Sequence, residues 1–80
     1  MDSLLLEKVI ITHGIDRLAA TVADEDDQTI TVTMRSPGSI RSVRIPRAAF
    51  RTYWSLHSDS ITLILRPGEL WHHTRRELFK

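Results

Sequence analysis

Cysteine is absent from this 80-residue chain. Without it the protein has no disulfide, no thiolate metal ligand and no thiol nucleophile, and it suits a reducing compartment, so we predict the cytoplasm. The chain has no apolar run near the roughly 20 residues of a membrane-spanning helix. Asp2 stands where a signal peptide carries basic residues. We therefore expect a protein without a disulfide scaffold and without a membrane segment.

Sequence motifs for catalysis are also missing. The chain has only three glycines, and no G-x-S-x-G nucleophile elbow, G-x-G-x-x-G fingerprint or P-loop occurs in it. A chain of this length leaves little room for an enclosed pocket of the usual size, about 300 Å³ or more. We predict that the protein is not an enzyme and that it uses no cofactor.

What is present is the composition of one small globular domain over residues 1–80. Hydrophobic residues make up 41% of the chain and charged residues 26%, as in folded rather than disordered proteins. The net charge is only +1, so the overall charge gives no reason to expect a nucleic-acid partner. A basic recognition surface would have to come from local clustering.

The strongest structural pattern is a β-hairpin over residues 29–45. Apolar residues alternate with threonines and an arginine from residue 29 to residue 35, which predicts a strand with one buried face. Pro37 and Gly38 then form a turn signal, because proline presets φ and glycine tolerates positive φ. This pair favours a type II turn, which fits a two-residue hairpin less well than the primed types and leaves a wider connection open.

The tightest register of this hairpin places Ser36 opposite Ser39. The apolar pairs then coincide on one face, whereas a slip of one residue would put them out of phase. These pairs are Ile30 with Ile45 and Val32 with Val43. Ile40 is out of step, so either it is exposed near the turn or a bulge lies at residues 41–42.

A helix is predicted over residues 47–57, directly after the proline that ends the hairpin. Phe50 and Trp54 recur at helical spacing, so both are expected to face the core. Arg47 and Arg51 are four residues apart and would point away from that apolar stripe.

Two segments before the hairpin are less decisive. Residues 7–12 and 15–23 are rich in β-branched or alternating apolar residues and are predicted to be strands, with a helical hairpin over the same region as the alternative. The alignment that places Val22 opposite Ile30 requires a five-residue loop over residues 24–28.

The C-terminal part is predicted to hold one more strand and one more helix. Residues 61–65 form a nearly continuous apolar run, as expected of a central strand, and a turn at residues 58–60 precedes it. A Pro-Gly break follows, and then a helix near residues 69–79. The residues expected on its buried face are Leu70, Trp71, Thr74 and Leu78.

These elements together predict an α+β, β-rich fold with about five antiparallel strands in a meander and short helices near residues 47–57 and 69–79. The meander is either open or bent into a small barrel. The pattern over residues 9–65 resembles SH3-like and Sm-like barrels, and because such barrels host many functions the resemblance implies a fold only. We also predict a homodimer, since the apolar segments are large for so small a core and an open meander leaves edge strands.

Five arginines fall within the 17 residues 35–51, and no acidic residue interrupts them. The candidate binding residues are Arg35, Arg41, Arg44, Arg47 and Arg51, together with Tyr53. Guanidinium groups contact phosphates, and a tyrosine ring can stack a base. We expect the outer side of the hairpin and helix to carry four exposed and roughly coplanar arginines, Arg35, Arg44, Arg47 and Arg51, with Arg41 at the turn end. The predicted function is a small binding module that binds nucleic acid weakly, mainly through phosphate; the alternative is a protein-binding regulator, inhibitor or adaptor.

The remaining titratable clusters predict no metal site. The acidic run Asp24–Asp27 lacks the spacing and glycine of a calcium loop. It must also lie at a different edge from the arginines, or it would cancel their field over a Debye length of about 8 Å. His72 and His73 are adjacent, so on a helix they diverge by about 100° and cannot share a zinc ion. His57 is expected at the boundary of the core.

Overall fold

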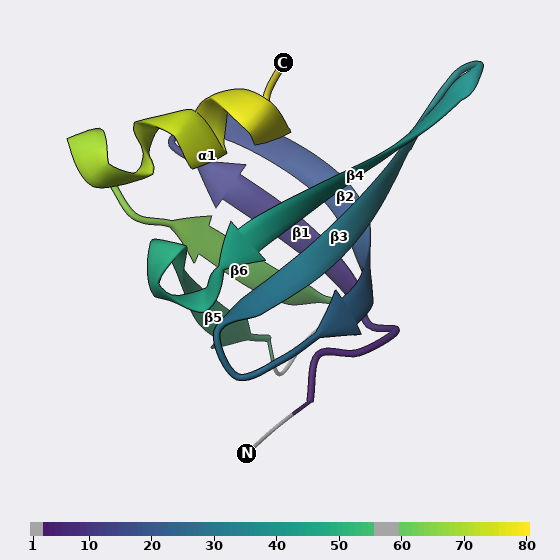
Figure 1. The fold of residues 1–80 in the computed structure, drawn as a ribbon, viewed down its shortest axis with the longest axis horizontal. Helices are drawn as coiled ribbons and strands as arrows, with labels where there is room; N and C mark the ends of the chain where they lie inside the picture. The colour runs from purple at the N-terminus through teal and green to yellow at the C-terminus, as the bar shows by residue number, and fades with distance from the viewer. Residues whose placement is uncertain (1–2, 56–59) are drawn as a thin grey trace.

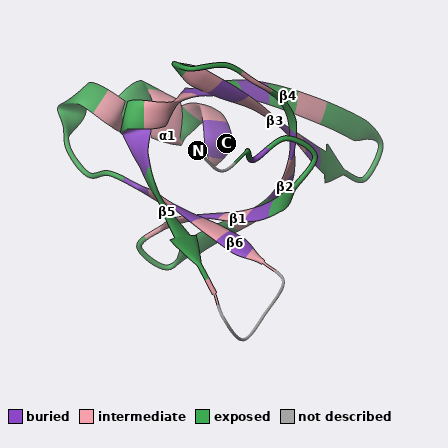
Figure 2. Ribbon diagram, turned by 90° about the horizontal axis from the view of Figure 1, so that it is seen from below, coloured by how far each residue is buried: buried purple, intermediate pink, exposed green. Residues whose placement is uncertain are grey.

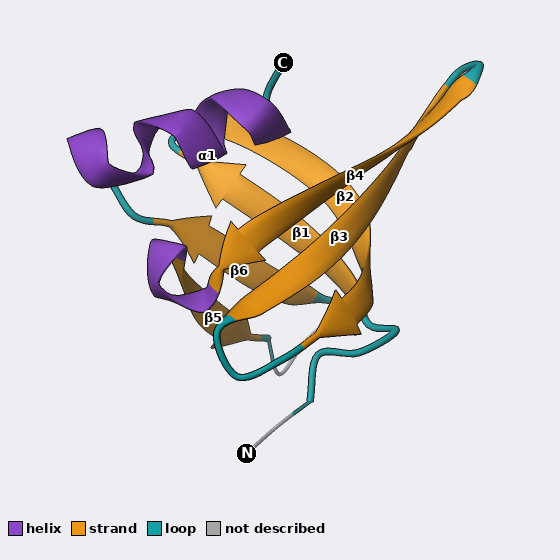
Figure 3. Ribbon diagram, in the orientation of Figure 1, coloured by secondary structure: helices purple, strands orange, loops and turns teal. Residues whose placement is uncertain are grey.

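A computed structural model describes residues 3–55 and 60–80 of the chain, and Figures 1 and 3 show its fold. Six β-strands account for most of these residues. They are β1 (Lys8–His13), β2 (Asp16–Glu25), β3 (Thr29–Ser36), β4 (Ser39–Pro46), β5 (Phe50–Trp54) and β6 (Ile61–Leu65). The other described elements are two 3-10 turns, η1 (Arg47–Ala49) and η2 (Glu69–Trp71), and one helix, α1 (His72–Leu78). The predicted α+β, β-rich class is confirmed.

All six strands form one sheet in the order β4-β3-β2-β1-β6-β5. Neighbouring strands are antiparallel except for β1 and β6, which run parallel. The predicted meander is therefore wrong beyond β4, because the β5–β6 hairpin joins the sheet on the far side of β1. The edge strands β4 and β5 do not pair with each other, so the sheet is open and the small-barrel alternative is wrong.

The sheet curls around a single hydrophobic core. Figure 2 shows this curl, with α1 at the side that the sheet leaves open. Buried residues alternate with more exposed ones along β3 and β4, so they share one face of the sheet, the inner side of the curl. The strand residues with no exposed surface are Ile11, Val22, Ile30, Val32, Ile45 and Leu63. Leu78 of α1 and Leu4 of the N-terminal segment join them. Strand residues that alternate with this core point the other way and make up what we call the outer face.

The β3–β4 hairpin has the register that the sequence predicts, from its turn to the pairing of Ile30 with Ile45. Gly38 adopts a φ of +82°, which residues with a side chain rarely take, so the two-residue turn closes the hairpin. Ile40 is 68% exposed, and the pairing continues through its neighbours without a bulge. The tip of this hairpin projects away from the rest of the molecule (Figure 1).

The register of β2 and β3 differs by two residues from the prediction. Val22 lies opposite Val32 and not Ile30, and a bulge follows it. The Asp26 carboxylate accepts hydrogen bonds from two backbone amides, each 2.7 Å away, and so closes a loop of three residues where five were predicted. The buried face is nevertheless as expected, because a shift of two residues preserves the alternation of side chains.

The predicted helix over residues 47–57 is wrong. Only the turn η1 forms, and the chain then pairs as β5 with β6. Phe50 is buried as predicted, but Trp54 is 47% exposed and does not belong to the core. A helix of two or three turns is marginal by itself, whereas a strand beside β6 satisfies its backbone groups along one full edge. His57 and most of the predicted turn before β6 lie outside the described residues.

The predicted C-terminal helix is present in a shorter form, as η2 followed by α1. Leu78 is buried and Trp71 packs against the core, as expected. Leu70, however, is 78% exposed. Its turn is a 3-10 turn, in which each residue advances by about 120° instead of the α-helical step of about 100°. The prediction that Leu70 lies on the buried face is wrong.

Candidate nucleic-acid interface

The five candidate arginines do not share one exposed face, and Arg41, the residue predicted at the turn end, is the first that faces elsewhere. It lies opposite Met34, on the inner side of the sheet. Its guanidinium donates hydrogen bonds to the backbone carbonyls of Glu77 and Leu78, the second at 2.9 Å. These carbonyls end α1, where the helix has no partners of its own for them and its dipole is negative. Arg41 therefore holds α1 against the sheet and does not contribute to an exposed binding surface.

Arg44 is exposed on the outer face, but it is paired with the acidic loop. Its Nη2 lies 3.9 Å from Oδ2 of Asp26 and donates a hydrogen bond to Oγ1 of Thr29 at 3.3 Å. The end of β4 and the β2–β3 loop lie together because Thr29 pairs with Pro46. The prediction that the acidic tip lies at a different edge from the arginines is therefore wrong.

Arg47 belongs to a cluster that we call the Glu25 clamp. Its Nη2 donates to Oε2 of Glu25 at 3.0 Å, and its Nε donates to the carbonyl oxygen of Asp26 at 2.8 Å. Glu25 also accepts hydrogen bonds from the Ser3 hydroxyl and from the Leu4 amide. The clamp ties the N-terminal segment, the β2–β3 loop and η1 together. Only 27% of the Arg47 side chain is exposed, so it supports the fold and offers little to a phosphate.

The carboxylates at this corner are stabilised in their charged form. The hydrogen bond from the Ser3 hydroxyl, followed by that from the Leu4 amide, lowers the pKa of Glu25 below its usual value. Backbone hydrogen bonds, first from Gln28, lower the pKa of Asp26. Both groups therefore keep their negative charge at neutral pH and offset the arginines beside them. This corner is a poor place for a polyanion.

The other three candidate residues lie on the outer face. In the β5–β6 pairing, Arg51 is opposite Ile64 and Tyr53 is opposite Thr62, so both point away from the core. Tyr53 is 59% exposed, and Arg51 is exposed as well. Arg35 is exposed near the end of β3, where it alternates with buried residues. Arg35 on β3 and the pair Arg51 and Tyr53 on β5 therefore lie on the same face of the sheet, in opposite halves of its strand order.

Two further cations share this face, Lys8 and Arg17, and sequence reasoning missed both. Arg17 pairs with Thr12, Thr12 with Ile64, and Ile64 with Arg51, which makes one row across β2, β1, β6 and β5. Alternation alone could have shown that Lys8 and Arg17 point away from the core. The row itself depends on the parallel pairing of β1 with β6, which the sequence pattern does not reveal.

Four cations on the outer face belong to this surface, and we call them the outer-face cations: Lys8, Arg17, Arg35 and Arg51. All four are exposed, and none of them forms an ion pair with another described residue. In the described strands, Asp24 is the acidic residue on this face, and it lies at the loop end of β2 beside the Arg44 corner. The rest of the face therefore presents positive charge to solvent.

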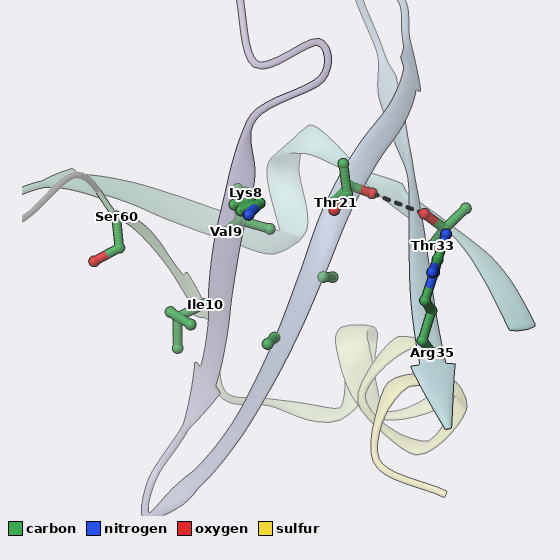
Figure 4. Close-up of a pocket in the computed structure, with 9 residues that line it drawn as sticks. Lys8, Val9, Ile10, Thr21, Thr33, Arg35 and Ser60 are labelled. Carbon is green, nitrogen blue, oxygen red and sulfur yellow. Dashed lines mark hydrogen bonds between the residues drawn. The ribbon is translucent and has the colours of Figure 1, made fainter. Parts of the chain in front are cut away.

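A groove of about 720 Å³ runs over this face where β1, β2 and β3 adjoin. Its lining includes Lys8, Ile10, Ala19, Thr21, Thr33 and Arg35. Figure 4 shows Lys8 and Arg35 at separate positions around it, with the hydrogen bond from Thr33 to Thr21 drawn between the strands. The groove thus combines an apolar floor, hydroxyl groups and two cations.

Neither a metal-binding cluster nor a membrane-spanning helix occurs in the described part of the chain. Within residues 3–55 and 60–80, no group of three or more His, Asp or Glu side chains is arranged to hold a metal ion. Within the same residues, no helix is long and apolar enough to cross a membrane. His72 and His73 lie exposed on α1.

Comparisons with models of known protein families, with curated proteins and with solved structures gave no match for this chain. A function cannot therefore be transferred from a relative. The charge, exposure and register of the outer face are the basis for the proposal that follows.

Proposed function

We propose that the protein is a non-enzymatic, cytoplasmic module that binds single-stranded nucleic acid on the outer face of its sheet. The observation that carries this proposal is the gathering of four exposed cations and an exposed tyrosine on one face, whose carboxylate in the described strands, Asp24, lies at the loop end of β2. Guanidinium and ammonium groups bind phosphate without regard to sequence. The ring of Tyr53 offers a surface on which one base can stack, an interaction worth about 1–3 kcal/mol.

The shape of the outer face favours a single strand over a duplex. The sheet curls around the core, so its outer face is convex (Figure 2). The row from Arg17 to Arg51 crosses four strands, a span of about 14 Å, and Arg35 lies beyond it on β3. A straight duplex touches a convex surface over a short stretch, whereas a flexible strand can follow the curvature and reach all the cations.

Salt dependence measures how many of these cations contact phosphate. Each contact with a single strand adds about −0.7 to the slope of log K against log salt, so four contacts give a slope of about −2.8. The double variant R17A/R51A should lower the slope to about −1.4. R44A is the matched control, because Arg44 is also an exposed arginine on the outer face but is paired with Asp26. Its slope should stay near that of the wild type.

The experiment is a fluorescence anisotropy titration with labelled single- and double-stranded oligonucleotides of equal length at low salt. Tighter binding of the single strand, with the slopes given above, supports the proposal. Absence of binding at about 100 μM protein, where the affinity would be weaker than about −5.5 kcal/mol, would overturn it. Binding that ignores salt would overturn it as well. Either result would favour the alternative of a protein-binding regulator, inhibitor or adaptor.

A further inference from the structure

We infer that the groove over β1, β2 and β3 receives one nucleotide of the bound strand. The base would lie flat against Ile10 and Ala19, and its phosphate would meet Lys8 or Arg35. This inference rests on the proposed function and names the ligand of one part of the outer face. The groove has a volume of about 720 Å³, which lies within the range of sites for small ligands, roughly 300–1,000 Å³.

The floor of the groove includes the apolar side chains of Ile10 and Ala19. Ile10 and Ala19 face each other across β1 and β2, so their side chains form adjacent parts of one surface. Ala19 is exposed, although alanines are readily buried, and its single methyl group leaves the space above the floor open. An aromatic ring system laid on this floor would remove apolar surface from water on both sides of the contact.

The walls supply the polar contacts that a nucleotide needs. Thr21 and Thr33 pair across β2 and β3, and the Thr33 hydroxyl donates a hydrogen bond to the Thr21 carbonyl at 3.4 Å. Lys8 on β1 and Arg35 on β3 flank β2 from opposite sides, so a phosphate at either end of the groove meets a cation. A nucleotide uses both the apolar floor and the cations, whereas an acidic peptide would use the cations and leave the apolar floor uncovered.

The first test uses adenosine monophosphate, inorganic phosphate and adenosine as separate probes of the ¹⁵N-labelled protein by NMR. Adenosine monophosphate should shift the amides of Ile10, Ala19 and Thr21 more than either partial ligand does, because it alone engages floor and cations together. If it shifts none of these amides, or if inorganic phosphate reproduces the whole effect, the inference is overturned.

The second test compares a single-stranded oligonucleotide with an abasic sugar–phosphate strand of the same length. The variant A19L fills the floor and should weaken binding of the strand with bases about fivefold, the worth of a few tens of Å² of lost apolar contact. Its affinity for the abasic strand and its salt slope should not change. S42L is the matched control, because Ser42 is exposed on the outer face but does not line the groove.

These outcomes separate the groove from the wider proposal. Equal effects of A19L and S42L, or equal affinity for the two strands, would overturn the groove while salt-dependent oligonucleotide binding still supported the outer face. Absence of binding to both strands would overturn the proposed function. Nucleotide-induced shifts at Ile10 and Ala19 would, in that case, still support the groove as a site for a free nucleotide.

Discussion

Replacement of Arg41 with methionine should destabilise the fold by about 2 kcal/mol. The side chain donates two hydrogen bonds to the last carbonyls of α1, and both are partly buried. A charged hydrogen bond contributes about 1.5–3 kcal/mol when it is shielded from water, and we take about 1 kcal/mol for each bond because solvent reaches this end of the helix. Methionine retains an unbranched aliphatic stem beside Met34, so the lost stability reports the guanidinium.

Urea denaturation followed by circular dichroism measures this effect. In a domain of this length, about 2 kcal/mol corresponds to a fall in melting temperature of roughly 8–16 °C. Hydrogen exchange should accelerate first in α1, because Arg41 is a contact between that helix and β4. R44M is the matched control, since its exposed ion pair with Asp26 at 3.9 Å should contribute less than about 0.5 kcal/mol.

The opposite result would return Arg41 to the binding surface that the sequence predicts. If R41M is as stable as R44M and yet flattens the salt dependence of oligonucleotide binding, the hydrogen bonds to α1 do not stabilise the fold. If R41M is destabilised but binds with an unchanged slope at low temperature, Arg41 is structural and the outer-face cations carry the phosphate contacts.

Four further predictions concern acid stability, the Glu25 clamp, assembly and metals. In the folded protein the pKa values of Glu25 and Asp26 lie below their ordinary values of 4.5 and 3.8. The stability that these carboxylates contribute is therefore complete above about pH 5 and is lost as the pH falls through their folded pKa values. The melting temperature should therefore drop below pH 4.5, and less steeply in E25Q; an equally steep drop in E25Q would show that the Glu25 clamp is not the cause. R44A/R47A should be clearly less stable than R44A alone, because Arg47 is part of the Glu25 clamp; equal melting temperatures of the two variants would show that Arg47 does not stabilise the fold. A homodimer remains a prediction that now rests on the unpaired edges of β4 and β5, and sedimentation showing only monomer at high micromolar concentration would end it. Stoichiometric zinc or calcium should leave the melting temperature unchanged, and a rise of several degrees would reveal a metal site.

Local chemistry was readable from the sequence where neighbours in the chain are also neighbours in space. The β3–β4 hairpin is the best example, because its register depends on a two-residue turn at Gly38 and on apolar pairs that agree with it, such as Ile30 with Ile45. The length of the turn at the acidic loop was not predicted correctly. A carboxylate that captures backbone amides changed the loop length, although the buried face of β2 was still predicted correctly.

The helix predicted over residues 47–57 shows how a pattern can be correct about one residue and wrong about the element. Phe50 is buried in either conformation, and a spacing of four residues to Trp54 fits both a helix and alternate positions of a strand. The choice between helix and strand depends on β6, whose edge offers hydrogen-bond partners to the backbone of residues 50–54. The residues of the segment alone do not show that β6 lies beside it.

The residues alone were enough to predict the class of fold, most of the core residues and a stretch of arginines dense enough to suggest a phosphate-binding surface. Which cations a ligand can reach depends on how distant elements pack together. Arg41 is used by α1, and Arg47 by the Glu25 clamp, because elements distant in the chain converge on them. Arg17 shares one row with Arg51 because β1 pairs in parallel with β6. Strand alternation is a local property, but the order of strands in a sheet depends on long-range packing. That order determines which residues are neighbours on the outer face.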